Sequence, residues 1–220
     1  MTQTRSRRLP AIARAPRSQA QRVAAMRDRL LDATLECLQE QGYSAMSTND
    51  VVRRARVSRG ALAHHFPTKA DLVRAAAERL IEQRGAEFRE RLRSIEPEGR
   101  TVVAALDVLW SMYEDASAAA LIELTVAARN KPELRAVISE MPGRIAQLTG
   151  EMVREFFPDL AALPFVEQSL YALHAFYGGL ALNGLSGDED LARRGAEVRR
   201  LLNVLASSMP SRLLAGGRIL

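Results

Sequence analysis

Apolar residues recur at helical spacing along most of the chain. The first run begins near Ser18 and ends at Gly42, and its apolar face consists of Val23, Leu30, Leu31, Thr34, Leu35 and Leu38. Cys37 lies beside this face, where a free cysteine acts as a small core residue. We find neither an internal repeat nor the alternating pattern of a strand, so the sequence predicts an all-α fold.

Two helix starts follow in close succession. Ser47 and Asp50 have the spacing of a capping box, with Asp in the usual Glu position. Ser58 is a second N-cap candidate directly after Val57. The short helices that begin at these caps are separated only by residues around Arg56, which is the spacing of a helix-turn-helix. With the first run, the sequence predicts three short helices within about fifty residues.

A longer amphipathic helix comes next. Pro67 ends the preceding segment near His65, because proline cannot continue a helix and disfavours it one residue earlier. Thr68 and Asp71 form another cap pair. The helix that they open has an apolar face made of Leu72, Ala76, Leu80, Phe88 and Leu92.

Beyond residue 96, proline and glycine divide the chain into further helices. We expect one helix from about Val102 to Tyr113 and another through Leu121 to Val126. Pro132 suits the first turn of the next helix, which Pro142-Gly143 should interrupt or kink. After a loop bracketed by Pro158 and Pro164, two more helices occupy about 165–184 and 190–208.

Composition narrows the class of protein. With 47% hydrophobic and 26% charged residues, the chain is typical of soluble globular proteins. No apolar run reaches the roughly 20 residues that span a bilayer, and the basic N-terminus lacks the apolar core of a signal peptide. A single cysteine excludes an internal disulfide framework. We therefore expect a cytoplasmic protein with no membrane partner.

The net positive charge is concentrated in the first third of the chain. Residues 1–69 carry thirteen Lys or Arg and five Asp or Glu, whereas residues 70–220 carry eighteen against twenty-one. A basic tail over 1–17, with five arginines and no acid, accounts for part of this excess. The basic residues left in 18–69 indicate a polyanionic partner for the predicted helix-turn-helix.

Residues 58–65, SRGALAHH, have the properties of a recognition helix. Such a helix needs small or polar residues at its N-terminal end, where they reach base edges, and phosphate donors at its flanks. Arg59 can pair with a guanine edge or a phosphate, and Gly60-Ala61 permit close approach. His64 and His65 carry ring N–H donors at the expected level of the phosphates.

The two histidines allow other interpretations. A metal site needs three or four ligands, and only His174 and Cys37 could add to this pair. Catalysis would need a carboxylate partner and a nucleophile, which the local sequence does not clearly offer. Either histidine could also be ordinary polar surface. Because paired carboxylates, metal-ligand spacing and a phosphate loop are lacking, we expect neither an enzyme nor a metal or cofactor.

The stretch LLDATLECLQEQGYSAMSTNDVVRRARVSRGALAHHFPTKADLV, residues 30–73, resembles the DNA-binding domain of the TetR family of bacterial transcription regulators. The resemblance covers this segment without a gap. It implies that side chains near the turn and on the second helix of the motif contact double-stranded DNA. The implied positions are Thr48, Arg56, Ser58, Arg59, Gly60, Ala61, His64, His65 and Lys69. Of these, Thr48, His65 and Lys69 would hold the DNA backbone. The residues that would face the groove or its edge are Arg59, Gly60, Ala61 and His64.

Two positions depart from the family pattern. Arg56 stands where the family usually has glycine, and a left-handed backbone there would cost about 1 kcal/mol relative to glycine. A phosphate contact by Arg56 could offset that cost. Ala63 replaces a phosphate-contacting tyrosine of many members, which shifts more of the contact onto His64.

The resemblance also implies a helical C-terminal domain that dimerises through its last two long helices and encloses a small-molecule pocket. Segments 165–184 and 190–208 are apolar enough to pack on the body and on a partner. A twofold homodimer places its recognition helices about 34–36 Å apart and therefore matches a palindromic operator.

Candidate lining residues of the pocket combine apolar bulk with polar groups: Trp110, Met112, Tyr113, Met141, His174 and Tyr177. Few charges among them favour an uncharged or weakly charged organic effector, and each could equally be core. We thus expect a basic disordered tail over 1–17, a DNA-binding domain over 18–67, a regulatory and dimerisation domain over 68–210, and a C-terminal tail over 211–220. The function expected is repression relieved by an effector; the alternative is a regulator or activator whose body binds no ligand.

Overall fold

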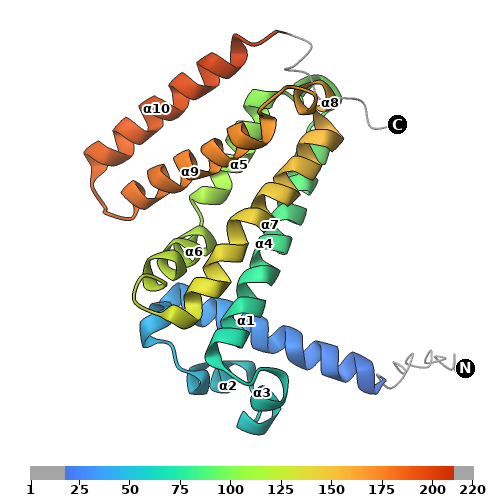
Figure 1. The fold of residues 1–220 in the computed structure, drawn as a ribbon, viewed down its shortest axis with the longest axis vertical. Coiled ribbons are helices and arrows are strands. Elements are labelled where there is room, and N and C mark those ends of the chain that lie inside the picture. The colour runs from blue at the N-terminus through green and yellow to red at the C-terminus, as the bar shows by residue number, and fades with distance from the viewer. Residues whose placement is uncertain (1–17, 211–220) are drawn as a thin grey trace, which may run out of the picture.

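The computed structural model describes residues 18–210, so the tails expected at 1–17 and 211–220 lie outside the described residues. Within 18–210 the regular elements are helices, without a strand, which confirms the all-α prediction (Figure 1). In chain order they are α1 (Gln19–Ala45), α2 (Thr48–Ala55), α3 (Arg59–His65), α4 (Lys69–Ser94), the 3-10 turn η1 (Pro97–Gly99), α5 (Val102–Tyr113), α6 (Ala116–Ala127), α7 (Pro132–Phe156), α8 (Pro158–Ala161), α9 (Val166–Gly184) and α10 (Glu189–Ser207).

The N-terminal helices form a small bundle at one end of the molecule. The second half of α1, with α2, α3 and the start of α4, encloses a core that includes Leu30, Leu38, Val51, Leu62 and Leu72. α1 has 27 residues; it begins after Ser18, as predicted, and continues past a kink at Gly42, where the run was expected to end. Its first turns project past α2 and α3 (Figure 1), so Val23 is 47% exposed and its placement on the apolar face was wrong.

The predicted caps are present. Ser47 and Asp50 form a reciprocal capping box on α2, and Thr68 and Asp71 form another on α4. The Ser58 Oγ accepts a hydrogen bond from the Ala61 N–H at 3.1 Å and caps α3. These side chains satisfy N–H groups that a helix start leaves without partners, which is why each element begins where the local sequence indicated.

The body consists of α5 to α10 and most of α4, which runs from the bundle through the length of the body (Figure 1). α7 continues through Pro142, whereas the sequence predicted an interruption or kink there. Buried side chains on both sides, Met141 and Leu148 among them, pack in the main core and hold the two halves together. No helix within residues 18–210 has the length and apolar character needed to cross a bilayer.

Gly42 marks the kink near the end of α1. Its backbone has φ 72° and ψ 172°, a region that is essentially restricted to glycine. Glu123 of α6 lies against this kink, and its Oε1 accepts a hydrogen bond from the Tyr43 N–H at 3.0 Å. A Cβ on Gly42 would lie 1.9 Å from that oxygen. The missing side chain therefore leaves room for the Glu123 carboxylate to reach the Tyr43 N–H.

We predict that Gly42→Ala lowers the free energy of unfolding by about 1–3 kcal/mol, because the new methyl group is strained and displaces Glu123. Gly143→Ala on α7 is the control, since a Cβ there meets nothing within 4 Å. Alanine in that helix should be neutral or stabilise by up to about 1 kcal/mol. Urea unfolding monitored by circular dichroism measures both, and an unchanged midpoint for Gly42→Ala would contradict the prediction.

Candidate nucleic-acid interface and ligand cavity

The turn between α2 and α3 is built by a residue in the left-handed conformation. Arg56 has φ 54° and ψ 50°, and its N–H caps α2 on the Arg53 and Val52 carbonyls. The Val57 N–H then donates to the Val52 carbonyl at 3.2 Å. The glycine-like geometry that the resemblance implied is thus present with an arginine, at the backbone cost noted above.

α3 presents one face to the core and the other to solvent. Leu62 and, at the C-cap, Phe66 are buried, while Arg59, Gly60 and His64 are exposed and Ala61 is partly exposed. A Cβ on Gly60 would meet only the Ser58 Oγ, at 4.0 Å. Folding therefore does not require a glycine at position 60. A binding partner that approaches the exposed face of α3 closely would require one.

The arginines near the motif divide into two groups. Arg54 pairs with Glu36 and Glu40 and so fastens α2 to α1. Arg56 and Arg59, by contrast, form no side-chain ion pair or hydrogen bond with any residue in the range 18–210. Their guanidinium groups remain available to an anionic partner.

The histidine pair closes α3. His64 is exposed and His65 is half-buried, with their ring centroids 5.5 Å apart. In the described part of the chain, no cluster of three or more His, Cys, Asp or Glu side chains is arranged to hold a metal ion. The geometry leaves the His64 ring pointing to solvent beside the exposed face of α3.

Lys69 ties the start of α4 to the end of α1. Its Nζ donates to the carbonyl oxygens of Tyr43 at 2.6 Å and Met46 at 2.7 Å, and lies 3.9 Å from the Tyr43 ring centroid. Burial, with a smaller contribution from Lys131, lowers the pKa of Lys69. Two of its three N–H groups are thus occupied within the chain, a structural role that the sequence did not indicate. Thr48, half-buried, is the first residue of α2.

Comparisons with known proteins agree with this geometry. Residues 30–76 match the family described as bacterial regulatory proteins, tetR family, and residues 96–208 match the tetracyclin repressor-like C-terminal domain. The chain belongs to the TetR family. It is a helix-turn-helix transcriptional regulator rather than an enzyme.

Individual relatives support the same assignment. The HTH-type transcriptional regulator CymR of Pseudomonas putida is 39% identical over 119 residues, which cover 54% of this chain but only 59% of CymR. An uncharacterised HTH-type regulator of Mycobacterium bovis is 30% identical over 148 residues, 65% of this chain and 76% of that protein.

Solved structures share the fold. A TetR-family regulator from Streptomyces coelicolor has a TM-score of 0.57 at 22% identity, covering 82% of this chain and 99% of that one. The multidrug binding protein EbrR, complexed with imidazole, has a TM-score of 0.58 at 24% identity, covering 84% and 97%.

The helical body of this TetR-family chain contains a cavity of about 250 Å³ between α4, α5, α6, α7 and α9. Four of the six predicted residues line it: Met112, Tyr113, Met141 and His174. Trp110 and Tyr177 do not. Tyr177 is fully buried and donates a hydrogen bond to the Leu106 carbonyl at 3.3 Å, and Trp110 packs edge-on against its ring.

Lining residues that the sequence reasoning missed come mainly from α4, α6 and α7, and include Ile81, Arg84, Phe88, Leu121, Leu148 and Met152. The helical period placed several of them on an apolar face, but it does not distinguish a face that packs against a neighbour from one that borders a cavity. Arg84, a charged residue between apolar turns of α4, was the available signal.

A chain of hydrogen bonds fixes the tautomer of His174. The Thr149 hydroxyl donates to the Ile145 carbonyl at 2.8 Å and therefore accepts from the His174 Nε2–H, also at 2.8 Å. Nδ1 is left to accept from the Tyr113 hydroxyl at 2.7 Å. Burial lowers the pKa of His174 to about 4 and raises the pKa of Tyr113 to about 12, so both groups are neutral near pH 7.

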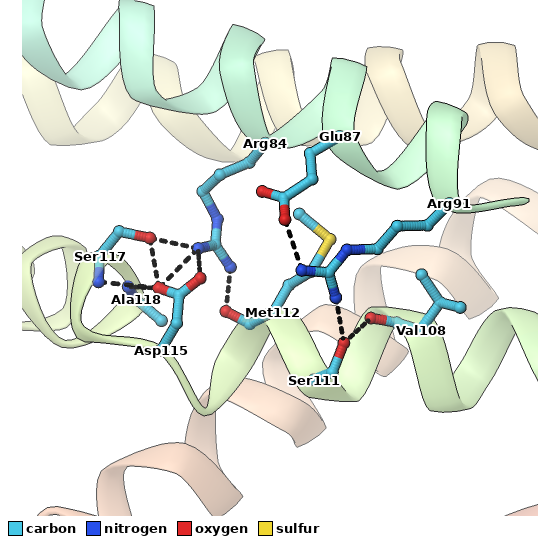
Figure 2. A network of polar contacts seen from close by, with 9 residues as sticks. All are labelled: Arg84, Glu87, Arg91, Val108, Ser111, Met112, Asp115, Ser117 and Ala118. Atoms are coloured by element: carbon cyan, nitrogen blue, oxygen red, sulfur yellow. Dashed lines mark hydrogen bonds and ion pairs between the residues drawn. The ribbon is translucent and has the colours of Figure 1, made fainter.

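Arg84 joins three helices at the wall of the cavity. Figure 2 shows its guanidinium group reaching from α4 to the Met112 carbonyl, to Ser117 and to the Asp115 carboxylate at 3.0 Å. Asp115 in turn caps α6 by accepting from the Ala118 N–H at 3.1 Å. Burial raises the pKa of Asp115, but the Ser117 hydrogen bond and the Arg84 charge outweigh it and lower the pKa overall. The ion pair adds no net charge to the cavity.

We predict that His174 makes the protein less stable as the pH falls from 6.5 towards about 4. In this window the unfolded chain takes up a proton at His174 that the folded state excludes, so stability falls with decreasing pH by up to about 1.4 kcal/mol per unit. His174→Gln removes this component. Urea unfolding across that range measures the difference, and parallel stability profiles for the two proteins would contradict the prediction.

Proposed function

We propose that this regulator is a repressor that binds a palindromic operator as a homodimer and releases it when a small uncharged organic effector enters the cavity. The observation that carries the DNA-binding part is the exposed face of α3, where Arg59 has no partner among residues 18–210 and small residues flank it. A single short helix reads too few base pairs for useful specificity, so two copies are needed.

In this proposal α3 enters the major groove. Arg59 reads a base edge, Gly60 and Ala61 permit close approach, and His64 lies at the edge of the groove. Residues around the motif bind the sugar-phosphate backbone: Thr48, Arg56, Ser58, His65 and the remaining N–H of Lys69.

Exposed apolar side chains on α9 and α10 support the homodimer. These two helices lie side by side at one edge of the body (Figure 1). Leu182 on α9 is 50% exposed, and Leu201 and Val204 on α10 are 57% and 64% exposed. Large apolar side chains grouped on adjacent helices are typical of an interface between subunits.

The effector is proposed from the chemistry of the cavity. Its walls are mainly aliphatic, His174 is neutral, and Asp115 neutralises Arg84. An apolar, uncharged molecule suits such a site. A regulator without a ligand would have a fully packed body, so the cavity favours the ligand-responsive alternative.

The proposed release operates through the helices that the cavity and the bundle share. α4 lines the cavity with Ile81 and Phe88 and holds the end of α1 through Lys69. α6 lines it with Leu121 and holds α1 through Glu123. An effector that fits one arrangement of these helices better than another shifts the population of dimers away from the spacing that matches the operator.

We predict different effects for two arginine variants. Arg59→Ala should weaken operator binding and relax the preference at one base position, at a cost of about 1–3 kcal/mol. Arg56→Gly should weaken binding to all sequences alike and reduce the salt dependence by about one phosphate contact. It should also stabilise the fold, because glycine suits the left-handed turn. Mobility-shift titrations on operator and base-substituted duplexes at several salt concentrations distinguish the two variants. If Arg59→Ala weakens binding to every duplex equally, Arg59 does not read a base.

We predict that Leu201→Glu converts the dimer into a folded monomer that no longer binds the operator, because two charges would face each other across a twofold interface. Val126→Glu is the matched control, since Val126 lies on α6 and is 61% exposed. Analytical ultracentrifugation gives the oligomeric state and circular dichroism the helix content. A Leu201→Glu protein that remains dimeric would place the interface elsewhere.

A further inference from the structure

A second cavity lies in the body beside the first. It has a volume of about 410 Å³ and is bordered by α4, α5, α7, α9 and α10 and by the segment around α8. Its walls include Leu92, Ala105, Leu106, Leu170 and Leu202. α8 and the end of α10 lie at the end of the molecule away from α2 and α3 (Figure 1), so this cavity extends the first one away from the DNA-binding bundle.

The two cavities share part of their walls. Phe88, Leu109, Thr149 and Met152 line both of them. A single layer of side chains therefore separates the two spaces. Methionine has three flexible side-chain torsions and adapts to irregular space, so Met152 can turn aside without moving a helix.

The second cavity offers no charged side chain and no free polar group among its lining residues. Its hydroxyls belong to Thr149 and Ser169, and both donate to backbone carbonyls of their own helix or its cap, at 2.8 Å to Ile145 and 3.0 Å to Phe165. A ligand there gains nothing from hydrogen-bonding groups and loses their hydration. The site suits a plain hydrocarbon chain.

The volumes of the two cavities also support a single combined site. A cavity of about 250 Å³ is below the range of about 300–1,000 Å³ that is common for small-molecule sites, whereas the two cavities together fall inside that range. We propose that they form one site for an elongated molecule with a single uncharged polar end and a long alkyl chain. The polar end lies in the first cavity and the chain passes Met152 into the second. This inference rests on the proposed ligand-responsive function and specifies the class of ligand.

Binding of straight-chain primary alcohols, from hexanol to tetradecanol, tests the proposal. We expect the affinity of the full-length protein, measured by displacement of the dye N-phenylnaphthylamine, to rise by up to about fourfold per added methylene through the whole series. Calorimetry should give one alcohol per protomer. An affinity that stops rising among the shorter alcohols, no binding by any alcohol, or two molecules of a long alcohol per protomer would overturn the single elongated site.

Two variants fill the second cavity from opposite walls, Leu170→Trp on α9 and Ala105→Phe on α5. Each should leave hexanol binding unchanged and abolish the gain from longer chains. Val23→Trp adds an aromatic side chain at an exposed site on α1 and should retain the full length dependence. Two cavity-filling variants are used in case one of them fails to fold. If a folded cavity-filling variant still gains affinity with each added methylene as the unmodified protein does, the proposal is overturned.

A separate mobility-shift assay distinguishes this inference from the proposed function. If the long alcohols bind with the expected length dependence but leave the operator complex intact, the elongated site stands and release by an effector fails. If hexanol alone releases the operator and added length has no effect, release stands and the elongated site fails.

Discussion

Tyr43, at the end of α1, joins the DNA-binding bundle to the body. Its N–H donates to Glu123 of α6, and its carbonyl and ring hold the ammonium group of Lys69 of α4. Its hydroxyl lies 3.4 Å from the carboxylate of Glu133 on α7. Four helices therefore meet at the end of α1, and the missing side chain at Gly42 leaves room there for the Glu123 carboxylate.

This junction connects the two functional parts of a TetR-family regulator. The helices that contact Tyr43, α4, α6 and α7, also form three walls of the cavity. Arg84 joins α4 to the start of α6 through Asp115 (Figure 2). In the proposed mechanism, a ligand that changes the spacing of these helices must either move the bundle or break contacts at Tyr43. In this mechanism, the contacts at Tyr43 are the physical route that couples ligand binding to the position of the DNA-binding bundle.

Sequence reasoning succeeded where the determinants are local. Capping residues such as Ser47, Ser58 and Thr68 act on N–H groups within three residues, so their spacing is visible in the chain. The left-handed turn at Arg56 was anticipated from the glycine that the family usually has at this position. Contacts that join distant positions were not visible: Glu123 lies 80 residues from Tyr43 and Lys69 lies 26. The role of Lys69 as an internal tether therefore emerged only from the fold.

The residues that line the cavity were also only partly predictable from the sequence. The sequence placed Tyr177 and His174 together among the candidate lining residues, yet Tyr177 is packed in a core while His174 borders open space. Which inward residues remain unpacked is decided by how neighbouring helices fit together, and that depends on the whole body. Pro142 does not interrupt α7 for a related reason, because packing of its neighbours maintains a helix that proline alone would weaken.

In the proposed function, a symmetric pair of α3 helices reads DNA sequence. Selection of bound duplexes from a random-sequence pool, followed by sequencing, is the sharpest test of this. We expect an inverted repeat whose half-site centres are separated by about 10–10.5 base pairs or a multiple of that spacing. Recovery of a single asymmetric half-site, or of no recurring motif, would contradict it.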